Sequence, residues 1–509
     1  MLAWTIYISF LGAAVVLLLP KGHARAPRHV ALLVAVLGFV AAVSGTLETK
    51  PGNLLTIARI PWIPSLGIEF HLAADGISLT LVLLTAIAAI AGILFSWDVA
   101  HRAKEFFALF LLLIGSVYGV FLSFDLFLLL VFYELAIIPK YFLIAVWGST
   151  RKEYGAMKLA LYSFGGSAMV LIGVIAAYAV AGARSMNILE LARFPFPQSF
   201  QMWAFPVVFV GFGILAGLWP FHTWAPTGHV AAPTAGSMLL AGVVMKLGAY
   251  GCLRVAITLF PSGLDPWDFT VLGLDSWRDA LSILAVIGIV YGALVALVQQ
   301  DFKFVIGYSS VSHMGFVLLG LLTLNTVGLS GAVLQMFSHG IIAGLLFAVV
   351  GRMVYDRTHT RDLPSLQVMS LNKAIPFAAV TFTIANMAAM GLPGFSGFVA
   401  ELQVLIGSWR AFPSLAVLTG FGIVVSVAYS LRVLQSAFFG ERANSATNEV
   451  LEEQRHSELE QITIPERIGA MLLIGTSLII GLWPRLLLDL IGPTFDLPHF
   501  DWLRRGGVL

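Results

Sequence analysis

Long apolar runs separated by short polar segments fill almost the whole chain. A transmembrane helix needs about 20 consecutive apolar residues, and the sequence holds roughly fourteen runs of this kind. We predict transmembrane helices at residues 2–20, 30–47, 75–97, 105–123, 125–147, 157–181, 203–220, 234–257, 280–299, 303–323, 328–352, 374–411, 413–437 and 467–491. The pattern therefore predicts an all-α polytopic membrane protein.

Prolines and glycines interrupt this pattern at two places, one in each half of the chain. The first break is the stretch 219–226, which reads WPFHTWAP, and the second is 391–397, which reads GLPGFSG. Paired interrupted helices are typical of transporters that hold an ion or small substrate near the bilayer midplane. The breaks therefore indicate a transport protein whose moving species is small and charged.

Composition excludes a soluble domain and gives no sign of redox chemistry within the chain. Hydrophobic residues make up 59% of the 509 and charged residues 11%. The single cysteine, Cys252, excludes an internal disulfide and a cysteine-bound iron–sulfur cluster. No phosphate-binding glycine loop, flavin fingerprint or metal-spaced His/Cys cluster is present, so we expect no cofactor-binding or metal site in this chain. The first apolar run lacks a basic n-region and a cleavage site, so we expect it to be a retained helix.

Lysine and arginine are concentrated on alternate loops. The richer set is Lys21, Arg25, Arg28, Arg102, Lys104, Arg151, Lys152, Lys158, Arg357, Arg361, Lys373, Arg442, Arg455 and Arg467. The positive-inside rule makes this side cytoplasmic, and an even number of helices then places both termini on the non-cytoplasmic side. The acidic segment 440–466 is expected on the cytoplasmic side, either as one amphipathic surface helix or as a solvated connector.

Five ionisable residues lie in the middle of apolar runs: Glu134, Lys246, His313, His339 and Glu401. An ionisable group at the bilayer centre costs at least ~2.5–3.5 kcal/mol, so such residues mark ion paths more often than structural ion pairs. A buried lysine can exchange its proton in the working pH range, as a relay requires. Both histidines have serines nearby that can order water, which favours a relay over simple packing.

Other polar residues have structural explanations that compete with a relay role. Lys140 lies about 9 residues, or ~13 Å, from the cytoplasmic end of its helix, and it either joins the relay or extends its stem toward the headgroups. His222 and His229 are either helix-end residues or groups that take up protons at the first break. N-caps are the simpler role for the acidic residues near predicted helix starts, Asp75, Asp125 and Asp301.

Several short motifs carry a resemblance to a known family. They are DGIS at 75–78, YE at 133–134 with YFLIAVWG at 141–148, HTWAP at 222–226 with His229, APTAGSM at 232–238, KLG at 246–248, QDFK at 300–303 with YSSVSHMGF at 308–316, YDRTHTRD at 355–362 and GLPG at 391–394. Over nearly its whole length the chain resembles the antiporter-like M-type subunits of complex I, the proton-pumping NADH:quinone oxidoreductase.

The resemblance implies a fold of about fourteen transmembrane helices with two inverted five-helix repeats and broken helices 7 and 12. Helices 1–3 would occupy residues 1–104, the first repeat (helices 4–8) residues 105–257, and the second repeat (helices 9–13) residues 280–437. A cytoplasmic connector would follow at 438–466, and helix 14 with the C-terminal tail at 467–509.

The resemblance also implies a proton-translocating subunit of an enzyme whose electron transfer takes place elsewhere. Protons would move through Lys246, the His313/His339 region and Glu401, while charge on Glu134 responds to the neighbouring subunit. The implied partners are the L-, N- and K-type membrane subunits and the lipid bilayer. NADH or another donor, flavin, iron–sulfur clusters and quinone would belong to partner subunits, and the location would be the inner (plasma) membrane of a cell.

One position departs from the family pattern. A lysine usually precedes the proline of the Pro-Phe-His-Thr-Trp stretch by five residues, and that position here is Leu215. We hypothesise that Lys140, where relatives generally have an uncharged residue, supplies the missing positive partner of Glu134. Six residues correspond to ~600° of helix rotation, so the two side chains do not share a face, unless Pro139 distorts that turn.

Two alternatives remain open. The same fold serves Mrp-type cation/proton antiporters and membrane-bound hydrogenases, which couple protons to sodium ions or to hydrogen chemistry. The loss of the seventh-helix lysine at Leu215 instead favours a scaffold subunit that does not pump.

Overall fold

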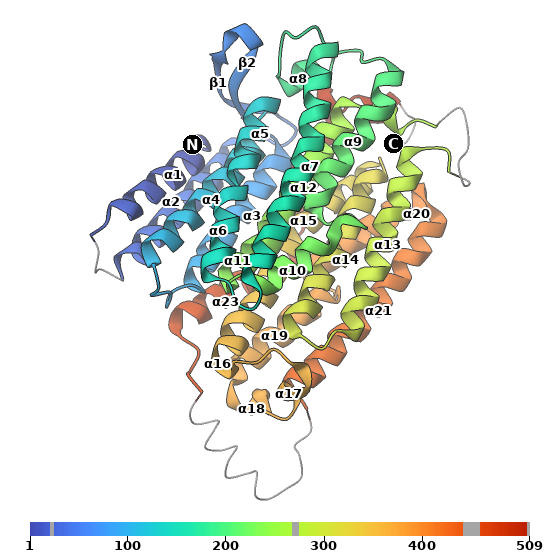
Figure 1. The fold of residues 1–509 in the computed structure, drawn as a ribbon. Helices are drawn as coiled ribbons and strands as arrows, with labels where there is room; N and C mark the ends of the chain where they lie inside the picture. Colours follow the sequence, from blue (N-terminus) through green and yellow to red (C-terminus); the bar gives the residue numbers. More distant parts are fainter. Residues whose placement is uncertain (21–24, 267–273, 441–458, 506–509) are drawn as a thin grey trace, which may run out of the picture.

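Long helices lie side by side and form an elongated bundle (Figure 1). The structure is a computed structural model that describes residues 1–20, 25–266, 274–440 and 459–505. Within these ranges, twelve helical segments are long and apolar enough to cross a membrane: Ala26–Glu48, Gly76–Leu94, Ala103–Leu122, Leu126–Trp147, Lys152–Val180, Gln198–Ala231, Thr234–Ile257, Trp277–Val298, Phe302–Leu322, Thr326–Thr358, Pro413–Phe438 and Ile464–Leu482. The predicted helical, polytopic class is confirmed, while the count of fourteen and the two inverted repeats stay predictions.

The elements have the following bounds. In the first half they are α1 (Ala3–Leu18), α2 (Ala26–Glu48), β1 (Leu55–Ile63), η1 (Pro64–Leu66), β2 (Ile68–Ala74), α3 (Gly76–Leu94), α4 (Ala103–Leu122), α5 (Leu126–Leu135), α6 (Ile137–Trp147), α7 (Lys152–Val180), α8 (Ile188–Leu191), α9 (Gln198–Ala216), η2 (Phe221–Thr223), α10 (Trp224–Ala231), α11 (Thr234–Leu239), η3 (Leu240–Val244), α12 (Met245–Gly251), η4 (Cys252–Ile257) and η5 (Pro261–Leu264).

In the second half they are α13 (Trp277–Val298), α14 (Phe302–Leu322), α15 (Thr326–Ala348), η6 (Val349–Tyr355), α16 (Asp356–Thr358), α17 (Leu363–Gln367), α18 (Leu371–Ala374), α19 (Pro376–Ala389), α20 (Ser396–Ala411), α21 (Pro413–Phe438), α23 (Ile464–Leu482), α24 (Arg485–Ile491), η7 (Gly492–Asp496), η8 (Pro498–Phe500) and α25 (Trp502–Arg505). The predicted amphipathic helix or connector at 440–466 lies largely outside the described residues.

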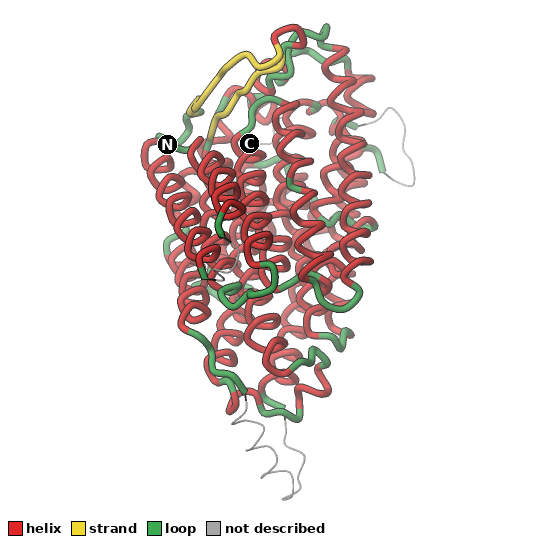
Figure 2. Tube along the Cα trace, turned by 60° about the vertical axis from the view of Figure 1, so that its left-hand side comes forward, coloured by secondary structure: helices red, strands yellow, loops and turns green. Residues whose placement is uncertain are grey.

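A two-stranded antiparallel hairpin, which the hydrophobic pattern does not predict, projects from one end of the bundle (Figure 2). Strand β1 is only partly buried, and Arg59 on it forms ion pairs with Glu69 of β2 and with Glu190. Burial opposes ionisation of Glu69, but hydrogen bonds from Arg59 and Asn187 outweigh burial and hold the pKa of Glu69 below its usual value. We call this end of the bundle the hairpin end, and the other the α16–α18 end.

Both predicted broken helices are confirmed. Helix α9 ends at Gly217, whose φ of 86° stops the helix, and the chain re-enters helical structure through η2 and α10. Helices α19 and α20 are separated by a turn in which Gly391 has φ 73° and Gly394 has φ 103°. Glycine populates this left-handed region without the steric penalty of a side chain, so these residues create the breaks.

Two predicted single helices are each divided in two, which corrects the sequence-based boundaries. The run 125–147 forms α5 and α6, which meet at Ala136. Pro139 has no N–H to donate to the preceding turn, which explains the interruption. The run 467–491 forms α23 and α24, since Pro484 likewise cannot continue the helix that ends at Leu482.

Three segments adopt π-helical structure, namely η3, η4 and η6. Each contains or adjoins a cationic residue: Lys246 follows η3, Arg254 lies in η4 and Arg352 lies in η6. π-Helical turns appear mostly as local bulges and frequently at functional sites, because they redirect side chains within a continuous helix.

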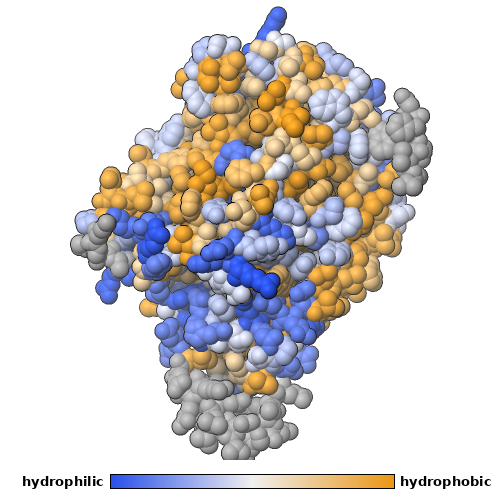
Figure 3. Space-filling model, in the orientation of Figure 1, coloured by the Kyte–Doolittle hydropathy of each residue, from blue (hydrophilic) through white to orange (hydrophobic). Residues whose placement is uncertain are grey.

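The surface and the interior of the bundle differ sharply. Large apolar side chains on α1, α2, α7 and α21 are exposed, and Figure 3 shows hydrophobic residues over much of the bundle and hydrophilic ones gathered toward the α16–α18 end. By contrast, the most apolar 18-residue stretches of Thr234–Ile257 and of Thr326–Thr358 are completely buried. A lipid-facing exterior therefore surrounds two central helices, and these carry Lys246 and His339.

Three predicted N-caps are confirmed. The side chains of Asp75, Asp125 and Asp301 accept hydrogen bonds from backbone N–H groups in the first turns of α3, α5 and α14. Such a cap satisfies N–H groups that have no partner within the helix.

Candidate functional site

Lys246 is the second residue of α12, which begins where the π-helical segment η3 ends. Its side chain is fully buried, and its Nζ donates hydrogen bonds to the carbonyl oxygen of Ala241 and to Nδ1 of His339, 2.7 Å away. His339 is itself buried on α15. The two residues predicted separately from the sequence are therefore direct partners.

Close packing between two glycines makes this contact possible. A Cβ atom on Gly340 would lie only 2.6 Å from the carbonyl oxygen of Gly242. Glycine at this point thus lets α15 approach η3 more closely than any other residue would allow. That approach brings the imidazole of His339 within hydrogen-bonding distance of Lys246.

His313 and Glu401 form a second buried pair. Nδ1 of His313, on α14, lies 3.1 Å from Oε1 of Glu401, on α20. Gln335 on α15 places its Nε2 3.4 Å from both the His313 Nδ1 and the Glu401 Oε1. The carboxylate also lies against the helix break, because a Cβ on Gly391 would come within 2.9 Å of its Oε2. Glu401 is thereby held between the break and His313.

The two pairs meet at the histidine rings. The ring centroids of His313 and His339 are 5.5 Å apart. A narrow cavity of about 10 Å³, lined by both rings and by Ser338, Gln335 and Glu401, lies beside them, and its volume suffices for about one water molecule. The resulting order of groups is Lys246, His339, His313, Glu401. We call this arrangement the buried row.

Electrostatics limits the charge that the buried row can hold. Two positive charges 2.7 Å apart, as on protonated Lys246 and His339, repel by about 6 kcal/mol at an effective dielectric constant of about 20. The pair therefore holds one excess proton far more readily than two. When a second proton binds one of these two residues, the repulsion favours release of the first proton from the other residue.

Glu134 and Lys140 do not join the buried row. Glu134 is only partly buried, whereas the Lys140 side chain is enclosed and its Nζ has no hydrogen-bond partner. Glu134 lies on α5 and Lys140 on α6, and among the described residues no ion pair links the two. Leu215, which stands where the family resemblance predicts a lysine, is buried as well.

His222 and His229 lie at the first break and are both buried. His222 belongs to η2, with its ring 5.2 Å from that of Tyr291. His229 lies in the last turn of α10, which ends at Ala231, and packs its ring 5.0 Å from that of Phe347. Among the described residues, neither ring nitrogen of His229 has a hydrogen-bond partner. Both histidines thus lie near helix ends, and whether they also take up protons stays a prediction.

Two charged clusters lie outside the groups predicted from the sequence. At the hairpin end, the fully buried Arg254 in η4 donates to the Asp75 carboxylate at 2.6 Å, with His499 of η8 beside them. At the α16–α18 end, buried Glu466 binds both Arg352 and Arg357 at 2.5 and 2.8 Å. The only feature of the sequence that could have indicated these two clusters is the presence of charged residues inside or at the edge of apolar runs.

The fold and these side chains define a polytopic helical protein with a row of ionisable groups through its interior. A family model described as NADH:quinone oxidoreductase/Mrp antiporter, transmembrane, matches residues 123–426. NADH-quinone oxidoreductase subunit M of Rhodobacter capsulatus is 35% identical to this chain, with 96% of this chain and 94% of the relative covered. The chain belongs to the NADH:quinone oxidoreductase/Mrp antiporter family.

Solved structures agree with this assignment. A chain of respiratory complex I from Thermus thermophilus with bound NADH has a TM-score of 0.86 at 26% identity, with 99% of both chains covered. A chain of the Mrp complex from Dietzia sp. DQ12-45-1b has a TM-score of 0.84 at 22% identity, with 100% of this chain and 99% of that chain covered. The second likeness shows a shared fold only.

Proposed function

We propose that this chain carries protons across the membrane as a subunit of a complex I-like NADH:quinone oxidoreductase. The observation that carries the proposal is the buried row. Four ionisable groups from α12, α15, α14 and α20 come together inside a bundle whose exterior is apolar. Burying an ionisable group costs free energy at each of these positions. A functional role explains why four of them are buried next to one another.

Proton movement through the buried row needs only small steps. Lys246 and His339 are in hydrogen-bond contact, and Nδ1 of His313 lies 3.1 Å from Oε1 of Glu401. The remaining gap lies between the two imidazole rings and borders the narrow cavity that Ser338 and Gln335 also line, where one water can bridge. Protons would reach Lys246 from the cytoplasmic side and leave through Glu401 beside the second helix break.

The remaining assignments follow the same proposal. The α16–α18 end, which holds most of the basic loop residues, would be cytoplasmic, and both termini would lie on the other side of the inner (plasma) membrane. L-, N- and K-type membrane subunits would be the neighbours, and partly exposed Glu134 would sense one of them. NADH or another donor, flavin, iron–sulfur clusters and quinone would act in partner subunits. Residues 105–257 and 280–437 would form the two inverted repeats.

A scaffold subunit that does not pump is the second candidate, and one observation favours it. The first half of the chain lacks a lysine at Leu215, and Lys140 has no hydrogen-bond partner in its place. The buried row lies mainly in the second half and is intact. We therefore favour a proton-carrying subunit over a scaffold subunit that does not pump.

Replacing Lys246 tests the proposal. In the assembled complex reconstituted into vesicles, Lys246→Ala should abolish proton pumping and strongly reduce coupled electron transfer, while the amount of assembled complex stays normal. The measurement is the number of protons moved per electron, in buffers with and without sodium. Normal pumping by the variant would refute the proposal in favour of the scaffold, and pumping that requires sodium would favour the antiporter alternative.

A further inference from the structure

Gln335 is an uncharged residue in contact with two members of the buried row. It lies on α15, four residues before His339, and its side chain is buried. Its amide nitrogen Nε2 is 3.4 Å from Nδ1 of His313 and 3.4 Å from Oε1 of Glu401, and those two atoms are 3.1 Å apart. One amide N–H₂ group therefore stands at equal distances from both ends of the His313–Glu401 pair.

The length of these contacts fits a donor that is shared between two acceptors. A hydrogen bond from N–H to a single oxygen is usually about 2.9–3.0 Å between heavy atoms, and both contacts of Gln335 are longer. An ionised carboxylate only accepts hydrogen bonds. The nitrogen end of the amide is therefore the end that fits beside Glu401.

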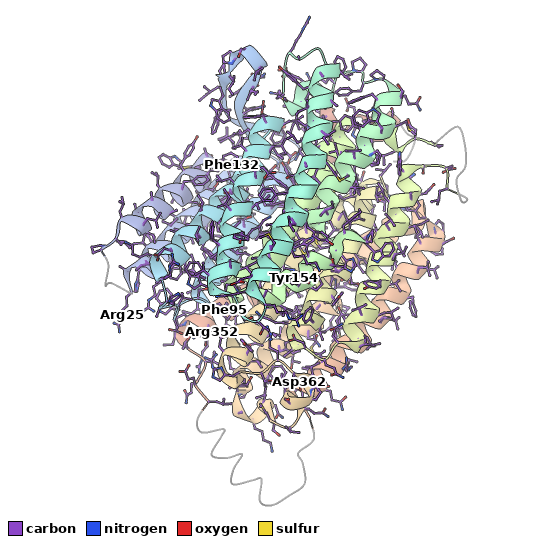
Figure 4. All side chains as sticks on the ribbon, in the orientation of Figure 1. Arg25, Phe95, Phe132, Tyr154, Arg352 and Asp362 are labelled. Carbon is purple, nitrogen blue, oxygen red and sulfur yellow. The ribbon has the colours of Figure 1, made fainter. Side chains whose placement is uncertain are left out.

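The oxygen end of the amide belongs to the cavity between the two histidines. Gln335 lines this cavity together with His313 and His339. Oε1 of Gln335 and Nε2 of each histidine are buried without a hydrogen-bond partner among the described residues. Figure 4 shows side chains throughout the interior of the bundle, and the space left beside these three residues is only about 10 Å³. One water molecule fits there and can bond to these atoms.

The His313–Glu401 pair changes its hydrogen bonding when it loses a proton. With the excess proton present, His313 is an imidazolium, and its Nδ1–H donates to Oε1 of Glu401. After release, His313 keeps a proton on Nε2 only, so the lone pair of Nδ1 faces the ionised Oε1 at 3.1 Å. Two buried acceptors that face each other without a donor are unfavourable, and this opposes release.

We infer that Gln335 is a positioning residue that supplies the missing donor when the His313–Glu401 pair has lost its excess proton. This inference rests on the proposed function and adds to it a residue that carries no proton itself. The proton moves from Nδ1 of His313 to the Glu401 carboxylate and then to water beside the second break. The amide N–H then lies between the neutral Nδ1 and the carboxylate. The next proton from His339 restores the imidazolium, and nothing is oxidised or reduced.

The helices packed around the pair bring further ionisable groups near it. Helix α15 brings His339, whose ring is 5.5 Å from that of His313, and with it Lys246 of α12. Helix α21 brings Tyr429, whose hydroxyl is 2.6 Å from Oγ of Ser309, a residue that lines the same cavity. Variants of Gln335 leave all of these groups in place, so comparison with the wild-type complex at the same pH removes their contribution.

Packing is the rival explanation for Gln335. On that view its side chain fills space between α14, α15 and α20, and a substitution would harm the arrangement of the helices rather than the release of a proton. The two explanations differ in their response to the proton concentration on the release side. A low proton concentration there relieves a defect in release, whereas it does not repair packing.

The test measures protons moved per electron by inverted vesicles that contain the assembled complex, with the α16–α18 end facing the medium. Gln335→Met has a similar length but no N–H donor, and it should lower the ratio about threefold or more while the lumen is buffered near neutrality. Raising the lumen pH by about two units lowers the proton concentration on the release side about a hundredfold and should bring the ratio back toward that of the wild type. Wild-type pumping by Gln335→Met in the neutral lumen, or a loss that the alkaline lumen does not relieve, would overturn the inference.

Two further glutamine variants keep the test decisive. Gln335→Asn withdraws the amide by one methylene, so it should show the same relieved loss, and it decides the matter where the methionine variant assembles poorly; wild-type pumping by it would overturn the inference. Gln403→Met is the matched control, because Gln403 lies on α20 two residues from Glu401 and also has a buried Oε1 without a partner among the described residues. It should pump normally, and a loss like that of Gln335→Met would count against a specific role for Gln335 and overturn the inference.

Lys246→Ala separates this inference from the proposed function. If it stops pumping at both lumen pH values while Gln335→Met pumps normally, the role of Gln335 is wrong and the proposed function stands. If Lys246→Ala pumps normally, the proposed function itself fails.

Discussion

The ammonium of Lys246 lies 2.7 Å from Nδ1 of His339, although the two residues are 93 positions apart in the chain. Neither the hydrophobic pattern nor the spacing within one helix specifies this contact. It depends on how closely α15 packs against η3, and that distance is set by Gly340 and Gly242. The contact between Lys246 and His339 therefore depends on the absence of a side chain at Gly340, one residue beyond the histidine.

Gly340→Ala should disrupt this contact without changing any ionisable group. The added Cβ would come within 2.6 Å of the Gly242 carbonyl oxygen and of a Leu84 methyl group, and overpacking of this kind typically costs ~1–3 kcal/mol. We expect α15 to move outward and proton pumping to fall toward that of Lys246→Ala. The control is Gly344→Ala on the same helix, where a Cβ has open space. Equal pumping by the two variants would show that the close approach is unimportant.

Much of the candidate site is predictable from the sequence because burial of charge is costly. Lys246, His313, His339 and Glu401 stand out as ionisable residues in apolar runs, and the structure confirms that all four are buried. Their pairing is not predictable in this way, since it depends on helix packing and on the π-helical turn before Lys246. Periodicity describes a straight helix and contains no information about such a turn.

Residues near helix ends were harder to predict for a different reason. Lys303 is the second residue of α14 and Glu466 the third of α23. At these positions a charged side chain usually reaches water or headgroups, so the sequence gives no reason to expect burial. The bundle encloses them because neighbouring helix ends and loops fold over them. The β hairpin was missed because its alternation is short and its first strand is mostly exposed.

Gly391→Ala should impair Glu401 through the helix break. An alanine there would need a left-handed backbone, at a cost of about 1–2 kcal/mol, and its Cβ would displace the Glu401 carboxylate from its place beside His313. We expect fewer protons per electron, as for Glu401→Gln. Gly394→Ala is the matched control, because φ at Gly394 is also positive but its Cβ meets nothing within 4 Å. If both alanine variants reduce the stoichiometry equally, backbone strain rather than the carboxylate is responsible.

The Asp75–Arg254 pair should stabilise the hairpin end of the bundle. Both side chains are fully buried, and His499 joins them from the C-terminal region. Removal of one partner leaves the other charge buried and unpaired, at a cost of ~3–5 kcal/mol. Arg254→Met and Asp75→Asn should therefore each lower the thermal stability of the assembled complex, and the double variant should be more stable than the two losses added together. Strict additivity would show that the two groups act independently.

The last prediction concerns the lysine that the family pattern has and this chain lacks, at Leu215. No direct ion pair joins Lys140 and Glu134. If Lys140 replaces the missing lysine, its ammonium must therefore act on Glu134 either over a longer distance or through a bridging water molecule. Lys140 is enclosed and has no hydrogen-bond partner, so a structural ion pair does not explain its charge. We therefore expect Lys140→Met to reduce coupled turnover about as much as Glu134→Gln, and the double variant to lose less than the sum.

Leu215→Lys supplies the strongest form of this test, because Leu215 is the position where the resemblance to the family leads us to expect a lysine. Introduced into the Lys140→Met background, it should restore part of the lost turnover, whereas Leu215→Met should restore none and controls for the change in shape. The rival view holds that Lys140 is a packing residue whose long stem fills space between helices. Under that view methionine, which is similar in length, would leave turnover nearly unchanged. A silent Lys140→Met variant would thus end the replacement hypothesis, and failure of Leu215→Lys to rescue a defective one would show that Lys140 acts somewhere other than on Glu134.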